Sequence, residues 1–143
     1  RAEAALALLD RRLDEATDEA TRRVYADLRD RTRALQYWAT TQRNTCAWVA
    51  GIYGYLRAET DAERDGFQQE VQAMIDLDLE NTRRLLALWE EGDTETFLVS
   101  DVGETSFVYG DNIGELLKRK IELTEQYRHH APAIDADLIW RLP

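Results

Sequence analysis

Apolar residues recur at helical spacing along most of the chain, and this pattern predicts four helices. Between residues 2 and 16, Leu6, Leu9 and Leu13 follow one another at intervals of three and four. From about 20 to 58 the period stays near 3.5, which predicts one long second helix. Its expected core positions are Val24, Leu28, Leu35, Trp38, Thr45, Val49, Ile52 and Leu56.

The second helix is long for a chain of 143 residues. A straight helix over this span would measure roughly 57 Å, whereas a compact domain of this size has a radius of gyration of about 14 to 15 Å. The helix therefore either bends or belongs to an elongated bundle. Gly51 and Gly54 are the expected bending points. Close packing against a neighbouring backbone is the alternative reason for these glycines.

A strong start signal separates the second helix from the third. Thr60 with Glu63 three residues later forms a capping box, which predicts a helix over 61–91 with Gly92 as its C-cap. The short link at 58–60 makes the two helices antiparallel neighbours. The apolar stripe of the third helix is Phe67, Val71, Met74, Ile75, Leu85, Leu88 and Trp89.

The last third of the chain changes character. Two β-type triplets within 97–110 predict a long loop or a small hairpin. Asp111 or Asn112 is then expected to cap a fourth helix, from about 113 to 130, that Pro132 stops. Its stripe is Ile113, Leu116, Leu117, Lys120, Ile121 and Tyr127, and an apolar tail with Leu138, Ile139 and Trp140 follows.

These elements predict an all-α fold, an antiparallel helical bundle of about four helices with the loop or hairpin at 97–110. The length of the chain fits a single domain over 1–143. The chain opens on Arg1 within helical pattern and ends abruptly at Pro143. We therefore expect a domain excised from a longer chain, whose cellular location the sequence leaves open.

Charge narrows the range of partners. The chain carries 28 acidic and 18 basic residues, a net charge of −10. Nucleic acid and anionic membrane surfaces both need a dense basic face, so neither is expected as a partner. No apolar run reaches the ~18 residues of a membrane span.

The common catalytic and metal-binding patterns are missing from the sequence. The two histidines, His129 and His130, are adjacent at one helix end, and Cys46 stands alone. A di-iron bundle needs two separated Glu-x-x-His pairs, and zinc sites need Cys or His at matched spacing. No Gly-x-Ser-x-Gly, P-loop or dinucleotide motif occurs. We expect no metal and no cofactor, and the question of enzymatic activity stays open.

The most unusual segment is 37–48, where aromatic side chains alternate with amides, hydroxyls and one guanidinium. Flat rings beside directional hydrogen-bonding groups suit a hydroxylated small molecule such as a sugar. A polar network that fixes helix packing is the alternative. The candidate ligand-binding residues are Trp38, Gln42, Arg43, Asn44, Trp48 and Asp78.

Asp78 joins this group because it interrupts the apolar stripe of the third helix. Arg43 lies 17 residues before the Thr60 turn and Asp78 lies 18 residues after it, so both reach a similar depth in the helical hairpin. An Arg43–Asp78 pair is therefore predicted, with a solvent-facing Asp78 as the alternative.

Three functions are compatible with these features. The long helices, aromatic polar patch and cut ends resemble, in general type, a helical accessory domain of a large bacterial enzyme such as a carbohydrate-active one. That resemblance implies a structural domain that packs against other domains of its parent chain, and it assigns no catalytic residue. The alternatives are a ligand-binding or sensor bundle with the aromatic–amide pocket, and an enzyme of unrecognised type.

Overall fold

The computed structural model describes residues 2–92 and 112–132, and this part of the chain is all-α. Its helices are α1 (Ala2–Glu15), α2 (Glu19–Arg57), α3 (Asp61–Glu91) and α5 (Ile113–Tyr127). The predicted all-α bundle is thereby confirmed. The expected loop or hairpin at 97–110 and the apolar tail with Leu138, Ile139 and Trp140 lie outside the described residues.

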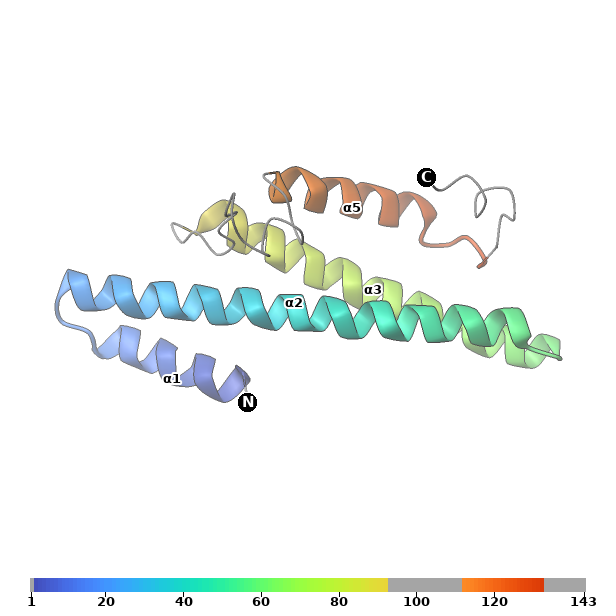
Figure 1. The fold of residues 1–143 in the computed structure, drawn as a ribbon, viewed down its shortest axis with the longest axis horizontal. Helices are drawn as coiled ribbons and strands as arrows, with labels where there is room; N and C mark the ends of the chain where they lie inside the picture. Colours follow the sequence, from blue (N-terminus) through green and yellow to red (C-terminus); the bar gives the residue numbers. More distant parts are fainter. Residues whose placement is uncertain (1, 93–111, 133–143) are drawn as a thin grey trace, which may run out of the picture.

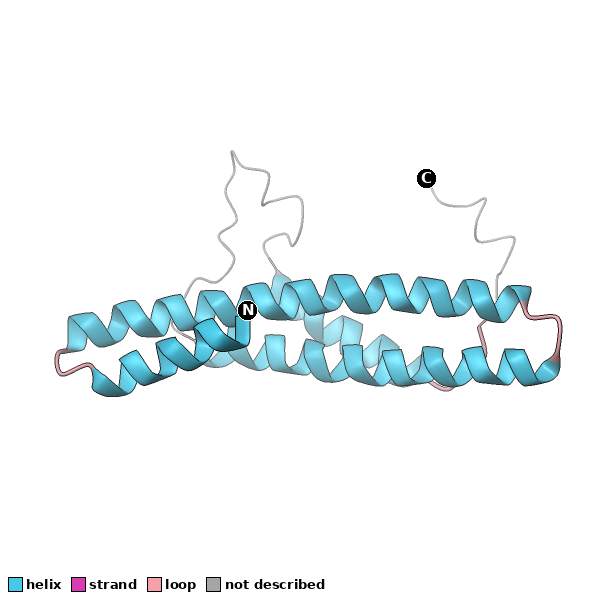
Figure 2. Ribbon diagram, turned by 90° about the horizontal axis from the view of Figure 1, so that it is seen from below, coloured by secondary structure: helices cyan, strands magenta, loops and turns pink. Residues whose placement is uncertain are grey.

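The helices form an elongated antiparallel array around α2 (Figure 1). α2 runs along the whole molecule, α1 folds back along its N-terminal half, and α3 returns antiparallel to it (Figures 1 and 2). α5 packs on α3. The 39 residues of α2 form one uninterrupted helix, so the bundle is long and the helix does not fold back on itself.

Side-chain caps explain why the long helices begin where they do. The Asp18 carboxylate accepts the backbone N–H of Thr21 at 2.9 Å, at the start of α2. At the start of α3 the hydroxyl of Thr60 accepts the N–H of Glu63, and the Glu63 carboxylate accepts the N–H groups of Thr60 and Glu59. The predicted capping box is therefore present, and Gly92 is the C-cap of α3.

The face that α2 buries differs from the sequence-based prediction. Six of the expected core positions are exposed, namely Val24, Leu28, Leu35, Thr45, Val49 and Leu56. The buried residues of α2 are Asp30, Ala34, Asn44 and Gly51, which are small or polar. Small residues let the helices approach closely, and hydrogen bonds satisfy the buried polar groups, since Asp30 accepts from Arg29 of α2 itself and Asn44 donates to α3. This interface therefore carries little of the apolar pattern from which a core is predicted.

Gly51 and Gly54 are contact points between helices. A methyl group added at Gly51 would lie 2.7 Å from Val71 Cγ2, and one added at Gly54 would lie 2.3 Å from the ring of Phe67. Both distances are far shorter than the 3.5–4.0 Å of favourable carbon contacts. Close packing between α2 and α3, the alternative to a bend, is the role of these glycines.

An apolar cluster attaches α5 to α3. Leu85 from α3 and Ile113 and Leu117 from α5 are buried together, and Tyr37, Leu86 and Trp89 pack around them. α5 ends at Tyr127, three residues before the predicted end. This attachment brings Lys120, at the middle of α5, to the polar centre of the α2–α3 pair.

Candidate functional site

The centre of the bundle holds a polar chain that links three helices. Arg43 donates from Nη2 and Nε to Asn44 Oδ1, at 2.8 and 3.2 Å. Asn44, with only 1% of its surface exposed, donates from Nδ2 to Asp78 Oδ1 at 3.3 Å. Lys120 Nζ lies 2.7 Å from the other carboxylate oxygen of Asp78. A guanidinium, an amide, a carboxylate and an ammonium group are thus connected in series.

The predicted direct pair between Arg43 and Asp78 is replaced by this relay. Arg43 and Asp78 do lie at similar depth, but the residue of α2 that faces α3 is Asn44, one position further along. A helix turns by 100° per residue, so the exposed Arg43 reaches only the amide oxygen of Asn44. Asp78 is half-buried and paired with a cation, as the pair hypothesis required, but the cation comes from α5.

A second set of hydrogen bonds next to this chain joins α2 to α3. Asn81 donates from Nδ2 to the backbone oxygen of Tyr37 and to Thr41 Oγ1, both at 3.0 Å. Within α3 itself, buried Thr82 donates to the backbone oxygen of Asp78 at 2.8 Å. Part of the polar block at 37–48 is therefore a packing network between helices.

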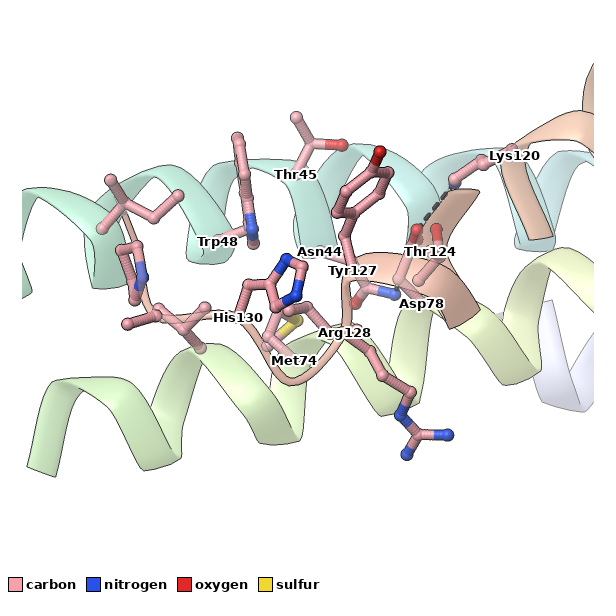
Figure 3. A pocket seen from close by; sticks show the side chains of 15 residues that line it. Asn44, Thr45, Trp48, Met74, Asp78, Lys120, Thr124, Tyr127, Arg128 and His130 are labelled. Carbon is pink, nitrogen blue, oxygen red and sulfur yellow. Dashed lines mark hydrogen bonds and ion pairs between the residues drawn. The ribbon is translucent and has the colours of Figure 1, made fainter. Parts of the chain in front are cut away.

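An open cavity of about 520 Å³ lies beside the polar chain, between α2, α3 and the end of α5 (Figure 3). Trp48 and Tyr127 approach it from α2 and α5, and the Asp78–Lys120 pair lies at one end. The cavity is lined by Asn44, Thr45, Trp48, Ile52, Val71, Met74, Ile75, Asp78, Lys120, Thr124, Tyr127, Arg128, His130, Ala131 and Pro132.

The candidate residues divide into two groups in the structure. Asn44, Trp48 and Asp78 line the cavity. Trp38, Gln42 and Arg43 are not among its lining residues, and Gln42 is exposed on another face of α2. The proposed aromatic–amide patch therefore does not come together as one surface, because its residues are distributed around the helix.

The residues that α5 contributes were missed as site candidates. Lys120, Thr124, Tyr127 and Arg128 line the cavity. A signal existed for Lys120, because it interrupts the apolar stripe of its helix as Asp78 interrupts that of α3. Two opposite charges within apolar stripes of neighbouring helices indicate a pair.

The cavity can hold a ligand by contact and hydrogen bonding. Both oxygens of Asp78 are already engaged, by Asn44 and Lys120. Arg128 donates from Nη2 to Asp76, while its buried Nε has no hydrogen-bond partner among the described residues. Tyr127 packs edge-on against His130 at a centroid distance of 5.4 Å. These groups supply aromatic surface and donors beside a neutralised carboxylate.

The described part of the chain contains neither a metal-binding cluster nor a membrane-spanning helix. Within residues 2–92 and 112–132, no three His, Cys, Asp or Glu side chains converge as ligands of a metal ion. Nor does any helix in these ranges combine the length and the apolarity needed to cross a bilayer.

The exposed side of α2 is the second feature of interest. Nine positions alternate at intervals of four and three, and all except half-buried Thr32 are exposed. We call this set the α2 stripe: Leu28, Thr32, Leu35, Ala39, Gln42, Cys46, Val49, Tyr53 and Leu56. Its largest side chains are far from buried, with Leu35 and Tyr53 each 63% exposed.

Comparisons of the chain with protein-family models, with curated proteins and with solved structures gave no match. The functional conclusions below therefore rest on the geometry of the described residues.

Proposed function

We propose that this chain is a non-catalytic helical accessory domain that acts through protein–protein contact along the α2 stripe. The observation that carries the proposal is the stripe itself, an apolar seam that continues for about 42 Å at 1.5 Å per residue. Monomeric proteins rarely expose contiguous apolar patches larger than a few hundred Å², and larger ones mark contact sites.

A role within a larger protein, such as a carbohydrate-active bacterial one, is part of the same proposal and is supported by the sequence pattern. Another domain of the parent chain is the alternative occupant of the stripe, and a chain that stays monomeric while exposing the stripe would favour it.

The test asks whether the stripe is a contact face or part of the chain's own core. The double variant Leu35→Glu/Val49→Glu is compared with Leu79→Glu, which introduces a charge at a position only 3% exposed. At nanomolar concentration we expect the stripe variant to keep its helical circular dichroism and its melting temperature, and to lose binding of an apolar dye. Leu79→Glu should unfold the chain.

Unfolding of the stripe variant would contradict the proposal, because the stripe would then be a face that the chain itself covers. Wild-type protein that binds no dye at nanomolar concentration would contradict it as well.

A second candidate function is the binding of a hydroxylated small molecule in the cavity. It is favoured by Trp48 and Tyr127, which provide aromatic surface for a sugar ring, and by donors on Lys120 and Arg128. The test is calorimetric titration with a panel of mono- and disaccharides and polyols.

Trp48→Ala should abolish any binding found in that panel, and Trp38→Ala is the matched control because Trp38 is not among the cavity's lining residues. Equal loss in the two variants, or no binding by the wild type, would exclude the cavity as a sugar site.

A further inference from the structure

We propose that the occupant of the α2 stripe is the α2 stripe of a second copy, paired in parallel and in register. The inference rests on the proposed contact function and names its partner. The alternation of four and three along the stripe is the heptad repeat of a left-handed coiled coil. Leu28, Leu35, Gln42, Val49 and Leu56 repeat at intervals of seven, and Thr32, Ala39, Cys46 and Tyr53 form the other half of the seam.

The area of the stripe comes close to what such a pair requires. A helix with its side chains is about 10 Å wide, so a seam of about 42 Å presents on the order of 400–450 Å² per copy. Two copies together approach the roughly 1,000 Å² at which specific interfaces begin. Because the size is at this lower limit, we expect an association in the micromolar range.

Charge also favours a second copy on this face. The chain has a net charge of −10, so most surfaces of two copies repel one another. The stripe itself contains no Asp or Glu. Neither do the positions that flank it, which are 29, 31, 36, 38, 43, 45, 50, 52 and 57. Like-charge repulsion between acidic groups is therefore smallest where we place the contact.

Three of the four arginines at the flanks already have a partner within their own chain. Arg29 is paired with Asp30 at 3.0 Å, and Arg43 is bonded to Asn44. Arg31 is paired with Asp27 at 2.8 Å. An uncharged seam, bordered by arginines of which three are already engaged, suits a copy of itself better than a strongly acidic helix.

The flanks also select the orientation. In a parallel pair, the flanking residues at 31, 38, 45 and 52 meet the residues five positions further along the other copy. Trp38 then meets Arg43 of the second copy, which is a favourable cation–π arrangement. In an antiparallel pair centred on the stripe, Arg43 would face Arg43 and Arg29 would face Arg57. Parallel pairing avoids these like-charge contacts.

Gln42 fixes the register. It is the polar residue at the middle of the interval-of-seven series. In the parallel arrangement each residue of the seam faces the same residue of the second copy. The two Gln42 amides can therefore donate to and accept from one another. A shift by one heptad would bury each amide against an apolar side chain, which costs free energy.

In the parallel in-register pair the two Cys46 thiols would face each other across the seam, so disulfide formation at Cys46 can be used to detect the pair. Sedimentation velocity between about 1 and 200 µM should show conversion of the 16.5 kDa chain to a species of twice that mass. Leu35→Glu/Val49→Glu should weaken association at least about tenfold. Leu77→Glu is the matched control, because Leu77 is an exposed leucine on α3, away from the stripe, and it should leave association unchanged.

Orientation is tested by disulfide formation with copper–phenanthroline as oxidant, under dimeric conditions. Wild type should cross-link through Cys46, and Cys46→Ser should not. In the Cys46→Ser background, Leu28→Cys and Leu56→Cys should each cross-link to itself. These positions lie 28 residues apart, about 42 Å along the helix. Only a parallel in-register pair places each of the two positions opposite the same position of the second copy.

A chain that stays monomeric throughout would overturn this inference while leaving the contact function standing, provided that the folded stripe variant still loses dye binding. Dimers that Leu35→Glu/Val49→Glu does not weaken would also overturn it. Cross-linking at the central Cys46 but at neither end would exclude a parallel pair that stays in register along the whole stripe, and the inference would again be wrong.

Discussion

Lys120 Nζ lies 2.7 Å from Asp78 Oδ2, so the ammonium group at the middle of α5 neutralises the carboxylate at the middle of α3. The side chain of Asp78 is 20% exposed and that of Lys120 is 38% exposed. The pair is therefore partly shielded from solvent, and its contribution should lie between those of surface and buried pairs.

A double-mutant cycle with Asp78→Ala and Lys120→Ala should give a coupling free energy of about 1 kcal/mol, reduced by added salt. The control is the Glu19–Arg23 pair, whose side chains are 73% and 80% exposed and whose coupling should be about 0.3–0.5 kcal/mol. Chemical unfolding measures both cycles. Equal coupling in the two pairs would show that α5 does not hold Lys120 against Asp78.

The glycines of the α2–α3 hairpin provide a second prediction. Gly54→Ala should reduce the free energy of unfolding by about 1–3 kcal/mol, because the new methyl group would meet the rigid ring of Phe67 at 2.3 Å. Gly66→Ala is the control, since nothing lies within 4 Å of the added atom. This control should stabilise α3 by about 0.5–1 kcal/mol. Stabilisation by both substitutions would mean that α2 and α3 are further apart than described.

Asn81 tests the packing network. Its amide group bonds two acceptors of α2, at Tyr37 and Thr41. Asn81→Asp keeps the shape but brings a carboxylate against these acceptors, so it should cost about 2–3 kcal/mol of stability. Asn81→Ala, which removes the polar group, should cost less than Asn81→Asp. The opposite order in urea unfolding would contradict the donor role of this amide.

The helix caps predict a loss of stability in acid. Hydrogen bonds from Thr21 lower the pKa of the Asp18 carboxyl, and hydrogen bonds from Thr60 and Glu59 lower the pKa of Glu63. Because both pKa values are lower in the folded state, the stabilisation is complete above about pH 5 and is lost as the pH falls below about 4.

Urea unfolding at a series of pH values from 7 to 3 measures this dependence. Asp18→Asn retains a good N-cap but cannot titrate, so its stability should fall less steeply between pH 5 and 3 than that of the wild type. Identical slopes would show that the Asp18 cap does not contribute to the acid sensitivity.

Helix boundaries were predicted well because their causes are local. The Thr60–Glu63 box marks the start of α3, and Gly92 marks its end, in both the sequence and the structure. The antiparallel order of α2 and α3 follows from the short link between them. Such signals depend on a few neighbouring residues and need no knowledge of the tertiary fold.

The buried face of α2 could not be predicted in the same way. A period near 3.5 shows that a helix has a seam, but it does not say which partner covers the seam. The apolar seam through Leu35 and Val49 is exposed, while the side with Asn44 and Gly51 is buried against α3. Contacts made by glycine and hydrogen-bonded amides leave no hydrophobic period in the sequence.

The candidate site was predicted in part for a related reason. Asn44, Trp48 and Asp78 were identified from unusual chemistry within a helix, and the structure places them at one cavity. The contributions of Lys120 and Tyr127 depend on where α5 returns over α3. That return follows the segment between the two helices, whose path no local pattern specifies.

The close approach of α2 and α3 at Gly51 and Gly54 has a consequence for the evolution of this protein. One side of α2 is limited by volume, so any side chain larger than hydrogen at these two positions would force Val71 or Phe67 of α3 to shift. No helix of the same chain sets such a limit on the exposed large side chains of the α2 stripe. Among descendants of this sequence, substitutions on the two sides of one helix should therefore obey different rules: conserved size on one side and conserved hydrophobicity on the other.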